Sequence, residues 1–143
     1  LECRALAATE PAADTDEARR VRSAAREQNV PVIASVHDFD ATPPVAELSE
    51  LLRAAAEEGD VAKLAVTATD RGDALDLLTA THRVTAAGET VATMGMGEAG
   101  RHTRAVALAY GSKIGYAPVD PADATAPGQY ALATLRRLVD ELG

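Results

Sequence analysis

Short, continuously apolar segments alternate with longer amphipathic segments along this chain, and this alternation restricts the possible folds more than any other feature. The apolar segments cover residues 31–36, 61–67, 90–94 and 112–117, and Leu1-Glu2-Cys3 has the character of a strand end. Apolar runs of this length are typical of strands that are buried on both faces. We therefore predict a parallel sheet of five strands, covered by helices that connect them.

The segments between the strands carry helix signals. Asp14-Thr15-Asp16-Glu17 offers a helix N-cap with a glutamate three residues on, and Thr42-Pro43-Pro44 places proline in the first turn of a second helix. The hydrophobic spacing predicts helices over 14–28, 43–58, 70–86, 101–110 and 128–142. Residues 117–128 contain three prolines and are expected to form a long, shaped loop.

Two folds fit this order of elements, a doubly wound sheet and a parallel (β/α) barrel of the TIM type. A complete barrel has eight βα units and takes about 250 residues, so five units would take about 155. The chain has 143 residues, which predicts a single domain over 1–143 with about five of the eight units. The chain opens on Leu1 rather than Met, which suggests an incomplete barrel whose N-terminal strands are absent.

Charge and composition exclude several kinds of partner. The formal net charge is −8, and no basic patch stands out, so nucleic acid and anionic membranes are poor partners. No apolar run approaches the length of a membrane span. The single Cys3 fits a reducing cytoplasm. Abundant acidic residues and scarce lysine suggest a source that lives in high salt, which screens acidic self-repulsion.

Lys63 is the first candidate for chemistry. Only two of the fourteen basic residues are lysines, and Lys63 lies inside the apolar run 61–67. A buried ammonium is costly, whereas a neutral amine attacks carbonyl groups, so a desolvated lysine is a candidate for Schiff-base chemistry. The alternative is an edge-strand lysine that prevents sheets from aggregating.

His37 is the second candidate, because it follows the apolar run 31–36, one strand before Lys63. Both folds place function at the carboxyl ends of parallel strands. We therefore expect a proton-transferring imidazole and an imine-forming amine to project from consecutive strands.

Residues Gly95 to Gly100 read G-x-G-x-x-G, and Asp120 lies twenty residues further on, as in a dinucleotide-binding fingerprint. That fingerprint belongs in the first turn of a βαβαβ unit, whereas only one strand is predicted downstream here. The alternative is that these glycines let a turn pass close to other backbone.

Four short motifs follow one another in a definite order. They are Ser35-Val36-His37-Asp38-Phe39 with Thr42-Pro43, then Ala62-Lys63-Leu64-Ala65, then Thr93-Met94-Gly95-Met96-Gly97 with Gly100 and Arg104, and finally Thr125-Ala126-Pro127-Gly128-Gln129. In order and spacing they resemble the C-terminal portion of the type I 3-dehydroquinate dehydratase family, Schiff-base enzymes of the shikimate pathway. The resemblance runs along the whole chain. The family usually has serine where this chain has Thr125.

The resemblance implies a lyase that dehydrates 3-dehydroquinate to 3-dehydroshikimate. Lys63 would form the imine with the ketone, and His37 would move protons as general acid and base. Arg104 would hold the substrate carboxylate, Thr125 and Gln129 would contact the substrate from the proline-rich loop, and Met96 would line the pocket. Neither a cofactor nor a metal is expected.

The resemblance also implies that three N-terminal barrel strands, which carry further polar pocket residues in the family, precede this portion. We expect either a separate N-terminal fragment of the same barrel or a homodimer to complete it. Three other functions stay open: a class I aldolase-like lyase, a nucleotide-binding module that uses Gly95 to Gly100, and an inactive barrel fragment.

Overall fold

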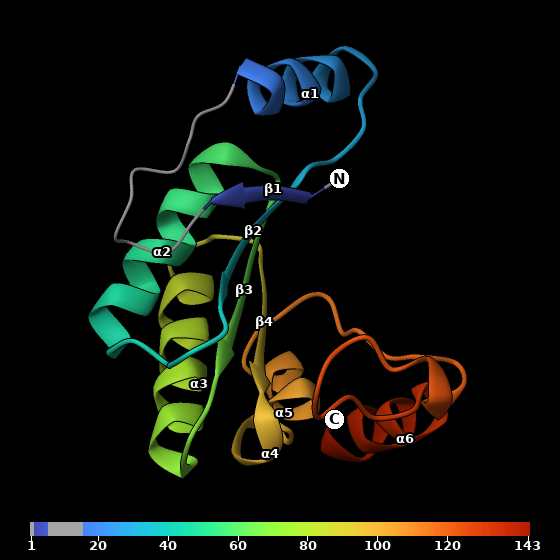
Figure 1. Ribbon diagram of the computed structural model, residues 1–143. Coiled ribbons are helices and arrows are strands. Elements are labelled where there is room, and N and C mark those ends of the chain that lie inside the picture. Colours follow the sequence, from blue (N-terminus) through green and yellow to red (C-terminus); the bar gives the residue numbers. More distant parts are fainter. Residues whose placement is uncertain (1, 6–15) are drawn as a thin grey trace.

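Four parallel strands form the sheet of this protein, and their order in space is their order in the chain (Figure 1). They are β1 (Glu2–Ala5), β2 (Ile33–Asp38), β3 (Val61–Thr67) and β4 (Val91–Met96). The computed structural model describes residues 2–5 and 16–143. The parallel sheet predicted from the apolar runs is therefore confirmed, with each strand joined to the next through at least one helix.

The helices match the predicted segments with differences at their ends. They are α1 (Asp16–Glu27), α2 (Val45–Glu58), α3 (Arg71–Ala86), α4 (Gly97–Gly100), α5 (Thr103–Ala109) and α6 (Leu132–Leu142). Asp70 caps α3, because its side chain accepts a hydrogen bond from the backbone N–H of Asp73. The cap predicted at Asp14 lies outside the described residues. The helix predicted from residue 128 begins only at Leu132, after the loop has turned at Gly128.

Helices α2 and α3 lie side by side along one face of the sheet and enclose the main hydrophobic core (Figure 1). The strands contribute every second residue to this core, as expected for a pleated backbone. The largest fully buried side chains here are Leu48, Leu52, Leu64, Val66, Leu77 and Val84. Burial of each such side chain stabilises the fold by about 1.5–3 kcal/mol.

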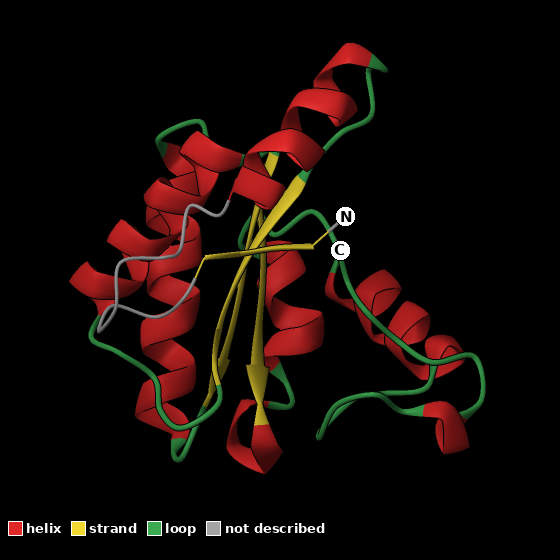
Figure 2. Ribbon diagram, turned by 45° about the horizontal axis from the view of Figure 1, so that its top comes forward, coloured by secondary structure: helices red, strands yellow, loops and turns green. Residues whose placement is uncertain are grey.

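The opposite face of the sheet carries different side chains, and this difference positions the candidate site. Because side chains alternate along a strand, Lys63 and Ala65 point away from the core that holds Leu64 and Val66. Met94 and Met96 join Ala65 in a second, smaller apolar cluster on this face. Figure 2 shows helices on both sides of the strands, with α6 set apart from the sheet and joined to it through long loops.

The prediction of a strand over 112–117 was wrong. This segment makes one backbone hydrogen bond to β4, from the Lys113 N–H to the Val91 carbonyl at 2.8 Å. The next backbone donor of β4, Thr93 N–H, binds the Ser112 hydroxyl at 3.0 Å. The side chain thus takes the place of a ladder partner, and the segment leaves the sheet to lie against Leu108 and Leu135. The described sheet therefore has four strands rather than five.

Candidate active site

A cavity of about 340 Å³ lies on the face of the sheet opposite α2 and α3, toward the carboxyl ends of β2, β3 and β4. All six residues predicted to form the site line it, namely His37, Lys63, Met96, Arg104, Thr125 and Gln129. They come from three strands, from α5 and from the loop before α6, so folding gathers residues spread over about two thirds of the chain.

Lys63 and His37 are in direct contact. A hydrogen bond of 3.0 Å joins Lys63 Nζ to His37 Nε2. The parallel register explains this contact, because Ser35 pairs with Lys63 and His37 pairs with Ala65. The side chains of Lys63 and His37 therefore leave the same face of the sheet from neighbouring strands, offset by two residues. The expected pair of an amine and an imidazole on consecutive strands is thus present in the geometry.

The environment of Lys63 excludes the edge-strand alternative. Strand β3 lies between β2 and β4, so it is an inner strand of the described sheet. Ala62 and Leu64, on either side of Lys63, are fully buried in the core, whereas Lys63 itself is half-buried and faces the cavity. Its ammonium also lies 5.2 Å from the centre of the Tyr116 ring.

Several contacts hold the segment that carries His37. The ring of Phe39 stacks on the His37 ring with an interplanar angle of 5° and a centroid distance of 5.6 Å. Thr67 Oγ1 donates to the Phe39 carbonyl at 2.9 Å, and Thr42 Oγ1 donates to the Thr67 carbonyl at 2.8 Å. Asp38 accepts hydrogen bonds from the backbone N–H groups of Asp40 and Ala41, so it shapes the loop.

Arg104 supplies a buried positive charge to the cavity. Only 5% of this residue is exposed, and burial lowers the pKa of its guanidinium, while Tyr130 raises that pKa in part. An arginine remains protonated in proteins despite such a shift. One terminal nitrogen of Arg104 donates to the Pro127 carbonyl at 3.0 Å, while its buried Nε has no hydrogen-bond partner. Arg104 can therefore offer further donors to an anion in the cavity.

The loop 125–130 closes on itself around Gln129. Gln129 Oε1 accepts hydrogen bonds from the backbone N–H groups of Thr125 at 2.8 Å and Ala126 at 3.2 Å. The Thr125 hydroxyl also donates to this oxygen, at a longer 3.5 Å. The loop thus uses the amide oxygen of Gln129 as an acceptor. The amide nitrogen is the only donor of this side chain, and it can donate into the cavity.

A second arginine fastens the same loop from outside the cavity. The Arg101 guanidinium lies over the Tyr130 ring, 4.5 Å from its centroid. Gly128, which has a positive φ of 80°, packs against the stem of Arg101, and a side chain there would meet the Gly97 carbonyl at 3.0 Å. Arg101 and Arg104 therefore fix the loop at Tyr130 and at Pro127 respectively.

We expect Arg101→Met to loosen this loop. The substitution keeps the apolar stem and removes a cation–π contact that contributes about 0.5–2 kcal/mol. Amide hydrogen exchange over 125–130 should accelerate, while exchange in β3 should stay unchanged. Arg136→Met, an exposed change on α6, is the matched control and should leave both regions unchanged. Unaltered exchange over 125–130 in Arg101→Met would contradict this role.

The glycines of the Gly95–Gly100 motif serve close packing in this structure. A Cβ on Gly100 would lie 2.8 Å from the backbone carbon of Gly95, and a Cβ on Gly95 would lie 2.9 Å from Gly100 Cα. The Gly95 N–H is also occupied, because it donates to Thr103 Oγ1 at 2.7 Å. These contacts favour a close turn over a phosphate cradle, since a cradle needs backbone N–H groups that face a ligand.

We therefore expect Gly100→Ala to destabilise the protein by about 1–3 kcal/mol, as overpacking against rigid backbone does. The measurement is the free energy of unfolding from denaturant titration in high salt. Glu98→Ala is the matched control, because Glu98 is exposed on the same short helix, α4. Equal stability of the two variants would reject this account of the motif.

The two other histidines of the chain lie outside the candidate site. His82 is exposed on α3, and its ring meets the edge of the Tyr110 ring, while His102 Nδ1 lies 2.8 Å from Arg71 NH1. Neither lines the cavity. The contributions of Tyr116 and Tyr130 were not predicted from the sequence, because neither belongs to a polar motif with recognisable spacing.

No three or more metal-ligating groups lie together among the described side chains. Among the helices that the structure describes, none combines the length and the apolar character of a membrane span.

Comparison with known proteins agrees with this arrangement. A family model described as type I 3-dehydroquinase matches residues 6–143. The chain belongs to this family. A 3-dehydroquinate dehydratase of Haloarcula marismortui is 58% identical over 137 residues, which cover 96% of this chain and 59% of that protein. The corresponding protein of Halobacterium salinarum is 54% identical and is covered over 57% of its length.

Solved structures of type I 3-dehydroquinase relatives also match. The crystal structure of 3-dehydroquinate dehydratase from Geobacillus kaustophilus aligns with a TM-score of 0.85 at 29% identity, covering 99% of this chain and 53% of that one. This chain thus spans little more than half the length of the relatives that it matches. The prediction of a salt-loving source is supported by these haloarchaeal relatives.

Proposed function

We propose that this chain is the imine-forming portion of a 3-dehydroquinate dehydratase. The observation that carries the proposal is the 3.0 Å contact between Lys63 Nζ and His37 Nε2, inside a cavity that also holds the buried cation of Arg104. A nucleophilic amine, a proton-transferring imidazole and an anion-binding group are the three functions that an imine-forming dehydratase of a keto acid requires.

The first step joins Lys63 to the substrate. As a neutral amine, Lys63 Nζ adds to the ketone carbon of 3-dehydroquinate, and His37 is close enough to accept the proton that the ammonium must first lose. The carbonyl oxygen then leaves as water, with one hydrogen from the amine and one added proton. The product is a cationic iminium, which makes the neighbouring C–H bond acidic.

The second step eliminates water from the substrate. His37 takes the proton from the carbon next to the iminium, and the electron pair of the C–H bond neutralises the nitrogen to form an enamine. The enamine then expels the hydroxyl group, which takes the proton back from His37 and leaves as water. Hydrolysis of the remaining conjugated iminium releases 3-dehydroshikimate and restores Lys63.

The other cavity residues orient the substrate in this proposal. Arg104 binds the carboxylate, supported by its burial and by the donors that remain beyond its contact with Pro127. Gln129 donates through its amide nitrogen, and Thr125 accepts through its hydroxyl oxygen, because the hydroxyl hydrogen is directed to Gln129 Oε1. Met96 forms an apolar wall against the ring of the substrate.

We further propose that the four strands belong to a single (β/α) barrel domain, as four of its eight βα units. Two observations support this: the strands are all parallel and in sequential order, and the matches cover only 57% and 59% of the two haloarchaeal relatives. The partner would then be an N-terminal segment of the same barrel, or a second copy of the chain.

A cytoplasmic location fits the single cysteine.

Borohydride trapping tests the function. Incubation with 3-dehydroquinate and borohydride should leave a reduced adduct on Lys63, identified by peptide mass spectrometry. A chain that gives no adduct with 3-dehydroquinate, but gives one with aldolase substrates, would reject the proposal.

A hybrid tests the barrel. The residues that precede the matched region in the Haloarcula marismortui relative are joined ahead of this chain, and turnover is compared with that of the 143 residues alone in high salt. We expect turnover in the hybrid only, because four strands cannot close an eight-stranded barrel. Equal turnover by the 143-residue chain as a monomer would reject an added segment, and equal turnover as a dimer would favour the second copy.

A further inference from the structure

Tyr116 is a cavity residue that the chemistry proposed above does not yet use. It follows α5 in the extended segment that leaves the sheet after Lys113. Gly115, just before it, lies so close to helix side chains that a Cβ there would be 3.3 Å from Leu135 Cδ2. Tyr116 itself packs against the apolar cluster formed by Ala65, Met94 and Met96. Packing on both sides thus holds the ring in one place.

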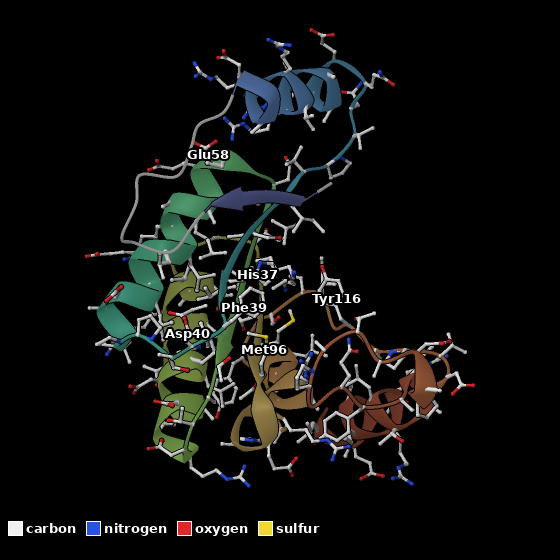
Figure 3. The ribbon with its side chains drawn as sticks, in the orientation of Figure 1. His37, Phe39, Asp40, Glu58, Met96 and Tyr116 are labelled. Carbon is white, nitrogen blue, oxygen red and sulfur yellow. The ribbon has the colours of Figure 1, made fainter. Side chains whose placement is uncertain are left out.

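The ring faces the nitrogen at which the imine forms. The distance from Lys63 Nζ to the ring centroid is 5.2 Å, within the range of about 6 Å over which aromatic faces attract cations. His37 and Phe39 lie on one side of this region and Tyr116 on the other, with Met96 close by (Figure 3). Lys63 is therefore placed between an imidazole and an aromatic face.

The free energy that the Tyr116 ring contributes changes when the Lys63 ammonium is replaced by the iminium. An ammonium has three N–H donors, and water in the open cavity solvates it, so an aromatic face adds only about 0.5–1 kcal/mol. The iminium carries the same charge but has one N–H, and the bound substrate excludes water from it. A desolvated cation gains about 2 kcal/mol from such a face. Only the difference between these two values favours the intermediate.

Resting on the function proposed above, we propose that Tyr116 stabilises the Lys63 iminium through the face of its ring. No new bond is formed: the ring acts on the cation that results when the amine and the ketone lose water. The ring also opposes the repulsion between this cation and His37 once the imidazole is protonated. Tyr116 thereby raises the fraction of bound substrate that is held as the covalent adduct.

The experiment compares Tyr116→Phe, which keeps an aromatic face, with Tyr116→Leu and Tyr116→Met, which remove it. The first measurement is the amount of borohydride-trapped adduct on Lys63 at saturating 3-dehydroquinate, in this chain and in the hybrid. We expect about a 5- to 10-fold decrease in the Leu and Met variants and nearly native amounts in the Phe variant.

The second measurement needs no substrate. Acetic anhydride labels amines only when they are neutral, and the extent of labelling at Lys63 is followed against pH by peptide mass spectrometry. Loss of the ring should move the midpoint of this curve about 0.5 toward lower pH, because the ammonium loses its stabilisation. Lys113, the other lysine, is the control within each sample and should not change.

The two measurements separate the possible outcomes. An unchanged pH curve or an unchanged adduct in both the Leu and Met variants would overturn the inference, and so would a Phe variant as impaired as they are. A decrease in adduct without a change in the pH curve would mean that the ring only fills space. Absence of any adduct in the native proteins would reject the proposed function instead, and the pH curve would still decide whether the ring acts on Lys63.

Discussion

In the hybrid that carries the added N-terminal segment, Lys63→Ala should abolish imine formation and turnover together. The amine is the group that forms the bond to the substrate in the proposed reaction, and no neighbouring side chain can replace it. The other lysine, Lys113, has its backbone N–H bonded to β4 and does not line the cavity. Borohydride trapping followed by peptide mass spectrometry measures the first effect, and a spectroscopic assay for 3-dehydroshikimate measures the second.

The matched control for this experiment is Lys113→Ala, which should keep both the adduct and the turnover. An adduct on Lys113 in the native protein, or a persistent adduct after Lys63→Ala, would contradict the assignment. A loss of turnover in Lys113→Ala with the adduct still on Lys63 would instead point to the fold of the segment that carries Tyr116.

His37→Ala should separate the two halves of the reaction. Imine formation depends mainly on Lys63 and should continue slowly, whereas proton removal and the departure of water require the imidazole. Loss of a general acid–base group lowers rates by about 10²–10⁴-fold. In the same hybrid, we therefore expect a trapped adduct on Lys63 together with very little product. Stopped-flow mixing followed by trapping gives the rate of adduct formation separately from turnover.

His82→Ala is the control for His37→Ala, because His82 is exposed on α3 and does not line the cavity. It should have native rates in both measurements. Nearly native turnover in His37→Ala would assign the proton transfer to another group in the cavity, and a complete loss of the adduct would mean that His37 is needed to deprotonate Lys63.

The pattern of residues along the chain was enough to predict the elements of the fold. Strands β2, β3 and β4 were predicted from continuous apolar runs, and α2 and α3 from helical spacing, because burial on a sheet or on a helix face imposes a period on the sequence. The nature of the side chains was also enough to select Lys63 and His37, since an ammonium within an apolar run needs a physical reason.

The prediction was weaker wherever the outcome depended on contacts between distant segments. Residues 112–117 have the composition of a strand, yet the Ser112 hydroxyl takes the place of a backbone partner of β4, and Gly115 packs against α5 and α6 instead of extending the sheet. The helix predicted from residue 128 begins at Leu132, because the loop before it is held by Gln129, Arg101 and Arg104.

The sequence by itself determined that this protein has a parallel sheet covered by helices, with a lysine and a histidine on consecutive strands. Only the tertiary structure decided that Lys63 lies on an inner strand within 3.0 Å of His37, that Arg104 is buried beside them, and that the Tyr116 ring faces the lysine. Periodicity reports which way a side chain points relative to its own element. Distances between side chains on different elements depend on strand register and on packing, which no local pattern contains.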